Sequence, residues 1–146
     1  MSNDNKYLGA TQDLISGTPK VNLWPQDDGS GCHRWILEHL SDDVYNILVF
    51  GGAPAGFKYL SSTAAGYVEL LGKDDGSGRQ RWIFKKFTSN TYNIMVYNGT
   101  NEGELYLSTG STGIVDLYSK DDNSGRHKWI VMGNKYNELF YGYLHF

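Results

Sequence analysis

A short acidic motif ending in tryptophan returns three times in this chain, and the repetition constrains the fold more than any other feature. Trp35, Trp82 and Trp129 are separated by 47 residues each time. Three units of this size fill nearly all of the 146-residue chain. Self-similarity at a fixed period is typical of folds assembled from repeated units. We therefore expect a single closed domain with threefold pseudo-symmetry.

Each copy of the motif contains two aspartates, a turn rich in glycine and serine, three residues of which at least two are polar or basic, and the tryptophan. The copies are Asp27-Asp28-Gly29-Ser30-Gly31-Cys32-His33-Arg34-Trp35, Asp74-Asp75-Gly76-Ser77-Gly78-Arg79-Gln80-Arg81-Trp82 and Asp121-Asp122-Asn123-Ser124-Gly125-Arg126-His127-Lys128-Trp129. They divide the domain, residues 1–146, into repeats of approximately 1–53, 54–101 and 102–146.

The residues around the motif predict four short strands in each repeat. Alternation of apolar and polar residues marks the second strand, as in Val68-Glu69-Leu70, and a run beginning with the tryptophan marks the third. No stretch of twelve residues keeps a helical period with caps. Twelve strands in three units predict an all-β fold, the β-trefoil, in which three hairpins close one end of a six-stranded barrel. A three-bladed propeller fits the same count but leaves little room for central packing.

The repeat also predicts the core and the place where the copies differ in length. Threefold-related residues should meet around the axis, and truncation of a core tryptophan to alanine typically costs about 3–5 kcal/mol. These sets are Leu8, Leu60 and Leu107; Leu23, Leu70 and Leu117; and Trp35, Trp82 and Trp129. The first repeat has extra residues between Thr11 and Pro19, which we expect in a turn. Asn46, Asn93 and Asn137 recur in the closing strand, where we expect a structural role.

Composition excludes several partners. The formal net charge is −3, whereas nucleic acids and anionic membranes call for a basic surface. No segment is long and apolar enough for a membrane span. The single cysteine, Cys32, has no partner within the chain for a disulfide, and the first residues lack the apolar run of a secretory signal. We expect a cytoplasmic protein, or one released without a signal peptide.

The motif resembles that of a known family of sugar-binding proteins. The acidic turn followed by Gln80-Arg81-Trp82, or by the variants His33-Arg34-Trp35 and His127-Lys128-Trp129, is similar to the repeat of the ricin-B-like β-trefoil lectins, especially the small fruiting-body lectins of mushrooms such as boletes. Val21-Asn22-Leu23-Trp24-Pro25 resembles that family's second strand. The resemblance implies a defence protein that binds galactose or N-acetylgalactosamine on glycans, agglutinates cells and catalyses nothing.

The chemistry of the repeated turn is suited to sugar hydroxyls. Carboxylates accept and guanidinium groups donate charge-assisted hydrogen bonds, which are roughly twice as strong as neutral ones. The candidate binding residues are Trp24, Asp27, Asp28, Gly29, Ser30, Gly31 and His33 in the first repeat; Asp74, Asp75, Gly76, Ser77, Gly78, Arg79 and Gln80 in the second; and Tyr118, Asp121, Asp122, Asn123, Ser124, Gly125, Arg126 and His127 in the third. Asn22, Glu69 and Asp116 are secondary candidates.

The same residues also suit a turn with no ligand. Aspartate and serine side chains bond to backbone N–H groups two residues on, and glycine adopts a positive φ. One of the two aspartates in each copy, and the Gln or His before the tryptophan, would then support the turn. The two interpretations, sugar contact and turn formation, both remain open at this point.

The repeats are not equivalent. The resemblance places a stacking ring directly after the second strand's leucine, where the chain has Trp24, Leu71 and Tyr118. The first repeat has Cys32 where the others have Arg79 and Arg126. Only the third repeat keeps both ring and guanidinium, so we expect it to bind sugar most strongly. Several weak sites on one rigid body gain avidity of roughly 10²–10⁴, and a homodimer would double their number.

Other function classes have less support. The four histidines and one cysteine show no familiar metal-ligand spacing such as His-Glu-x-x-His, and a catalytic carboxylate pair has no need of three copies. We therefore expect no enzyme activity, no metal and no cofactor. A trefoil protease inhibitor would act through one loop, for which residues 11–19 are the candidate. An actin-binding trefoil would need a basic or histidine-rich face that is missing here.

Overall fold

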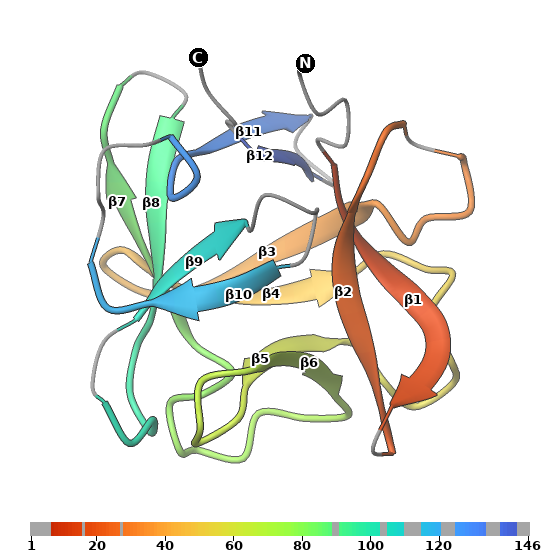
Figure 1. Cartoon of the computed structure of the whole chain (residues 1–146), viewed down its shortest axis with the longest axis horizontal. Coiled ribbons are helices and arrows are strands. Elements are labelled where there is room, and N and C mark those ends of the chain that lie inside the picture. The colour runs from red at the N-terminus through yellow and green to blue at the C-terminus, as the bar shows by residue number, and fades with distance from the viewer. Residues whose placement is uncertain are drawn as a thin grey trace.

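The computed structural model describes residues 7–15, 17–26, 28–88, 91–102, 105–109, 115–120, 125–133 and 138–142, with backbone alone for 13, 15, 132, 133 and 138–142. These residues form twelve strands (Figure 1): β1 (Tyr7–Ile15), β2 (Thr18–Trp24), β3 (Arg34–Ser41), β4 (Val44–Val49), β5 (Tyr59–Ser62), β6 (Val68–Leu71), β7 (Trp82–Lys86), β8 (Thr91–Val96), β9 (Tyr106–Thr109), β10 (Val115–Tyr118), β11 (Trp129–Gly133) and β12 (Glu138–Gly142). No helix occurs among the described residues, so none there crosses a membrane.

Six strands close into a barrel. Antiparallel pairing runs from β3 to β4, β7, β8, β11, β12 and back to β3. The other six strands form the hairpins β1–β2, β5–β6 and β9–β10, and each hairpin also pairs with one barrel strand through β1, β5 or β9. A ring shared by all three repeats is the β-trefoil predicted from the sequence, whereas separate propeller blades would not pair in this way.

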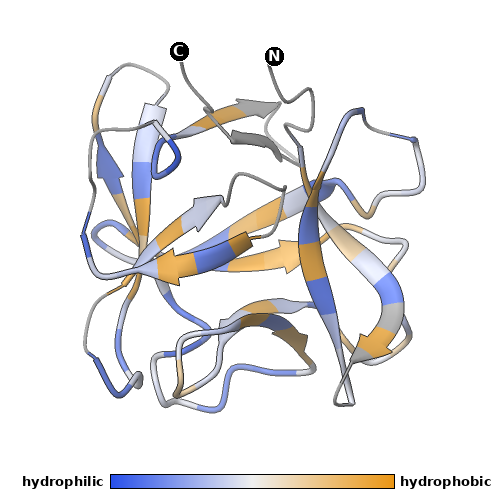
Figure 2. Cartoon of the chain, viewed as in Figure 1, coloured by the Kyte–Doolittle hydropathy of each residue, from blue (hydrophilic) through white to orange (hydrophobic). Residues whose placement is uncertain are grey.

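The predicted core is present. Trp35, Trp82 and Trp129 are fully buried, as are Leu8, Leu60 and Leu107, and all six belong to one hydrophobic cluster. Leu23 and Leu70 are buried with them, and Leu117 is partly buried against the same cluster. Figure 2 shows the corresponding alternation of hydrophilic and hydrophobic residues along β2 and β10. Alternation along a strand places apolar side chains on one face of the sheet, which here is the interior.

Each core tryptophan also makes a polar contact that the sequence pattern does not reveal. The Nε1 atoms of Trp35, Trp82 and Trp129 donate hydrogen bonds of 2.8–2.9 Å to the backbone carbonyls of the buried leucines in their own opening strands. A buried indole N–H needs an acceptor. The tryptophan therefore fixes the distance between the barrel and the hairpin of its own repeat.

The length difference in the first repeat falls in strands and not in an enlarged turn. β1 and β2 continue pairing as far as Ile15 and Thr18, with an irregularity in register between Ala10 and Leu14. Gly17, with φ 88°, lies in the reversal. The expectation of a longer turn over Thr11 to Pro19 was wrong, because the added residues complete cross-strand hydrogen bonds and lengthen the hairpin.

Candidate functional site

The acidic motifs form the three connections from a hairpin to the barrel, between β2 and β3, β6 and β7, and β10 and β11. The first two have the same backbone shape. Gly29 and Gly76 have φ values of 81° and 82°, and Gly31 and Gly78 both have 95°. Side chains other than glycine rarely adopt these values. The glycines of the motif therefore define one loop conformation, which sequence divergence around them has not altered.

In the second repeat the loop is held by its own side chains. Asp74 Oδ1 accepts a hydrogen bond of 2.9 Å from Gly76 N–H, and Asp75 Oδ1 accepts one of 2.9 Å from Ser77 N–H. The Ser77 hydroxyl in turn accepts a bond of 3.2 Å from Arg79 N–H. These are the bonds that aspartate and serine make in turns. The turn interpretation is thus correct as far as these oxygens are concerned.

Asp74 is the structural aspartate of the pair. Its Oδ2 accepts hydrogen bonds from Asn46 Nδ2 at 3.0 Å and from Arg81 Nε at 2.8 Å, and its side chain is 15% exposed. Burial pushes the pKa of Asp74 upward, but the bonds from Arg81, Asn46 and Gly76 outweigh burial and lower it. Both carboxylate oxygens are occupied by the protein, so Asp74 has little left to offer a ligand.

Asp75 and Arg79 face outward beside it. Asp75 Oδ2 lies 3.5 Å from Arg79 Nη2, and the side chains are 34% and 28% exposed. Hydrogen bonds from the Ser77 hydroxyl and backbone lower the pKa of Asp75, which keeps it charged. Arg79 also reaches the Gly99 carbonyl at 3.4 Å. An ionised acceptor and a guanidinium at this loose spacing form a pair that neighbouring hydroxyl groups of a sugar could bridge.

The residue two before each tryptophan lies underneath the loop. Gln80 is fully buried, accepts a hydrogen bond from Asp75 N–H at 3.0 Å and donates one to Ser61 Oγ at 2.9 Å. His33 and His127 are equally buried. A sugar bound on the surface of the loop cannot touch these side chains, because they have no exposed surface. Burial therefore favours a supporting role for these three residues over direct contact with a sugar.

Asparagines from the preceding repeat support two of the loops. Asn46 Nδ2 donates to the Gln80 carbonyl at 2.8 Å, and Asn93 Nδ2 donates to the His127 carbonyl at 2.8 Å. The structural role expected for these asparagines is confirmed at both positions. Asn137 lies outside the described residues. Each of the two asparagines joins the end of one repeat to the loop of the next, which a single-repeat view of the motif could not show.

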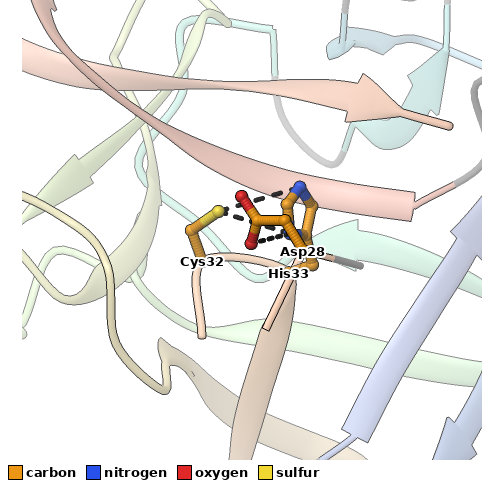
Figure 3. Close-up of side chains that lie close together, drawn as sticks. All are labelled: Asp28, Cys32 and His33. Carbon is orange, nitrogen blue, oxygen red and sulfur yellow. Dashed lines mark hydrogen bonds and ion pairs between the residues drawn. The ribbon is translucent and has the colours of Figure 1, made fainter. Parts of the chain in front are cut away.

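The first repeat replaces the pair of Asp75 and Arg79 with a different set. Asp28 is 54% exposed and lies 3.5 Å from His33 Nδ1, and Cys32 Sγ lies 3.3 Å from the same nitrogen (Figure 3). Hydrogen bonds from Ser30 lower the pKa of Asp28. Trp24, expected as the stacking ring, packs edge-on against His33 with ring centroids 5.1 Å apart. Asp27 lies outside the described residues.

The third repeat brings the expected ring and guanidinium together. The Arg126 guanidinium carbon lies 5.7 Å from the centroid of the Tyr118 ring, and that ring meets His127 edge-on at 5.2 Å. Both Tyr118 and Arg126 are partly exposed. Burial raises the pKa of nearby Asp116, while Arg126 acts in the opposite direction. Asp121, Asp122, Asn123 and Ser124 lie outside the described residues.

Two aromatic side chains beside the loops were not among the binding residues predicted from the sequence. Phe50 and Tyr97 follow β4 and β8 and are 55% and 46% exposed. Their backbone N–H groups donate to the carbonyls of Arg34 and Arg81, each at 2.8 Å. Each ring therefore stands next to an acidic loop, where it could meet the apolar face of a sugar. Both repeats carry an aromatic residue directly after the closing strand, but the sequence pattern alone would place such a residue in the hydrophobic core.

No protein-family model and no curated protein sequence matches this chain. Solved structures do match in fold. A designed threefold-symmetric protein, ThreeFoil, has a TM-score of 0.65 and 16% identity over 90% of this chain and 100% of its own. A lectin of Polyporus squamosus, solved with the human-type influenza-binding epitope Neu5Acα2-6Galβ1-4GlcNAc, has a TM-score of 0.59 and 19% identity. It is covered over 44% of its length, and 93% of this chain takes part.

Lysenin, solved with phosphocholine, has a TM-score of 0.58 and 14% identity, with coverage of 93% of this chain and 39% of lysenin. The chain thus spans less than half of the Polyporus lectin and of lysenin. At these identities the likeness concerns the fold. The chain has a β-trefoil fold that it shares with a carbohydrate-binding lectin.

Proposed function

We propose that this protein is a multivalent lectin of the ricin-B-like type that binds galactose or N-acetylgalactosamine and agglutinates cells without catalysis. The observation that carries the proposal is the second-repeat loop. In this loop the carboxylate of Asp74 is bonded to other groups of the protein, whereas Asp75 faces outward with its Oδ2 3.5 Å from Arg79 Nη2. Asp75 also supports the turn through Oδ1, which accepts from Ser77 N–H, but its Oδ2 faces outward. The outward pair supplies an acceptor and a donor next to the exposed ring of Tyr97.

Weak individual sites are expected from such a shallow surface. Each sugar hydroxyl exchanges a hydrogen bond to water for one to protein, so the net gain is small. A monosaccharide should bind with a dissociation constant on the order of 1 mM, or about −4 kcal/mol. Three loops related by pseudo-symmetry would convert this into useful avidity on a cell surface. The partner is therefore a glycoprotein or glycolipid that carries several galactosides, and a homodimer would increase the valency further.

A glycan array of the purified protein tests the proposal. Galactosides with and without terminal sialic acid should bind above glucose and mannose glycans, and free galactose should inhibit agglutination of red cells. The variant Asp75→Asn combined with Arg79→Met should reduce the heat of galactose binding in calorimetry. Glu102→Gln, an exposed carboxylate in a turn outside the three loops, is the matched control. An array without preference for any galactoside would contradict the proposal.

A further inference from the structure

The first repeat gathers three metal-ligand side chains at one point of its loop. The donor atoms of Asp28, Cys32 and His33 all lie within 4.8 Å of one another. Figure 3 shows the three side chains close together, all from the stretch 28–33. Thiolate, imidazole and carboxylate are the three ligand types that zinc takes in proteins. The spacing Asp-x-x-x-Cys-His is not one of the familiar metal-binding patterns, so a metal site was not expected from the motif.

The donor atoms are close enough for one ion to gather them. With Zn–S near 2.3 Å and Zn–N or Zn–O near 2.0–2.1 Å, ligand atoms in a tetrahedral site are roughly 3.3–3.6 Å apart. Asp28 Oδ1 and His33 Nδ1 are 3.5 Å apart, which is within this range. Cys32 Sγ lies 3.3 Å from His33 Nδ1 and 3.7 Å from His33 Nε2, so the sulfur stands over the ring. The Cys32 side chain therefore has to turn toward the Nδ1 lone pair when an ion binds.

Two of the ligands are buried, and the imidazole is held in place by its neighbours. Cys32 and His33 are 7% and 0% exposed. The His33 ring is wedged by Trp24, and a Cβ on Gly9 would lie only 2.5 Å from His33 Cδ2. The backbone carbonyl of Cys32 accepts a 2.9 Å bond from Ala10 N–H. Asp28 is 54% exposed. A buried pair with a third ligand at the rim leaves the fourth position open to water.

The fold itself does not require this set. The second loop has the same glycine φ values but carries Arg79 and Gln80 at the positions of Cys32 and His33. A guanidinium there pairs with Asp75 and would repel a cation. Packing and turn formation therefore account for the loop but not for its Cys-His sequence in the first repeat.

We propose that the first repeat is a zinc site, with Cys32 Sγ, His33 Nδ1 and a carboxylate oxygen of Asp28 as protein ligands and water as the fourth. Thiolate and imidazole select zinc over the hard cations Mg²⁺ and Ca²⁺. The zinc site shares its loop with the proposed sugar binding but is tested without any sugar, and it makes the first repeat a metal centre where the second carries an ion pair.

Cobalt and zinc binding to the untagged full chain test this directly. Co²⁺ bound by Cys32 should give the near-ultraviolet thiolate-to-cobalt absorption, Zn²⁺ should bleach it, and calorimetry should find one zinc per chain. Cys32→Ser should abolish the absorption. His33→Gln, which copies the second repeat, should weaken zinc binding by more than about 100-fold, since even outer-shell partners of metal ligands are worth 10- to 100-fold.

The pair Asp28→Asn and Asp75→Asn serves as the matched control, because both change an exposed aspartate at the same loop position. Only Asp28→Asn should weaken zinc binding. Absence of the thiolate absorption in the wild type would overturn the proposal. Zinc affinity that survives in Cys32→Ser and His33→Gln would also overturn it, since the metal would then be held elsewhere. Urea midpoints of all variants show that each is folded.

Discussion

Two adjacent aspartates in the second loop have opposite roles, and exchanging each for asparagine separates them. Asp74 accepts hydrogen bonds from Gly76, Asn46 and Arg81. Asn at this position keeps one oxygen for the Gly76 N–H but turns an amide N–H₂ toward donors that had faced a carboxylate. Asp75→Asn keeps an oxygen for the Ser77 N–H and changes only the outward Oδ2 beside Arg79. We expect Asp74→Asn to lower stability and Asp75→Asn to spare it.

The expected loss of stability in Asp74→Asn follows from the buried partner of Asp74, which is Asn46. Asn46 is 3% exposed, and a hydrogen bond to a charged group contributes about 1.5–3 kcal/mol. The ion pair with Arg81 contributes little to this loss, because the Arg81 side chain is 40% exposed and solvent screens its charge. The expected loss for Asp74→Asn is therefore about 2 kcal/mol. The change at Asp75 should stay within about 0.5 kcal/mol, as surface substitutions usually do.

Urea unfolding at pH 7, followed by tryptophan fluorescence, measures both changes as shifts of the midpoint at constant slope. The pH dependence gives a second readout. The folded-state pKa of Asp74 lies below its ordinary value of 3.8, so the stabilisation is complete above that value and is lost as the pH falls through the folded pKa. The deficit of Asp74→Asn should shrink correspondingly. If both variants lost the same free energy of unfolding, or if the loss in Asp74→Asn did not depend on pH, the structural role of Asp74 would be refuted.

Three further substitutions test other contacts. Gly9→Ala places a Cβ 2.5 Å from Trp24 Cδ1 and should cost about 1–3 kcal/mol in urea unfolding through overpacking; an unchanged midpoint would show that the ring moves freely. Asn46→Ala removes the donor to the Gln80 carbonyl and should cost a similar amount by the same measurement, unless water replaces the amide. Arg126→Met should lower the heat of galactose binding more than Arg79→Met if the third repeat is strongest, and equal losses would argue against that ranking.

The β-trefoil could be predicted from the sequence because its evidence is repeated three times. Any one strand pattern is ambiguous, but three copies of the same tryptophan and the same alternation have to satisfy a common architecture. The buried leucines and tryptophans followed from symmetry for the same reason. The extended hairpin of β1 and β2 did not, because whether added residues pair or loop out depends on cross-strand hydrogen bonds that a sequence period does not contain.

The candidate site was predicted less completely, because burial separates residues that are adjacent in the motif. Asp74 and Asp75 look interchangeable in sequence, yet a neighbouring repeat supplies Asn46 to only one of them. The position before the tryptophan shows the same effect. Arg81 donates a hydrogen bond of 2.8 Å to Asp74. Lys128, at the equivalent position, is buried, and its Nζ lies 4.3 Å from the centroid of the Phe87 ring. Burial lowers the pKa of Lys128. The residue type at this position does not reveal which of these partners it meets.

This division between inner and outer residues explains how the first two loops, which share one shape, can carry different chemistry. The backbone of the second loop is set by glycine conformation and by buried groups such as Gln80 and Asn46, which do not reach the surface. The outward atoms can then differ at little cost in stability, because surface substitutions rarely exceed about 0.5 kcal/mol. Arg79 and Cys32 occupy equivalent places on equivalent backbones, so the ligand preference of each repeat is free to diverge while the trefoil remains intact.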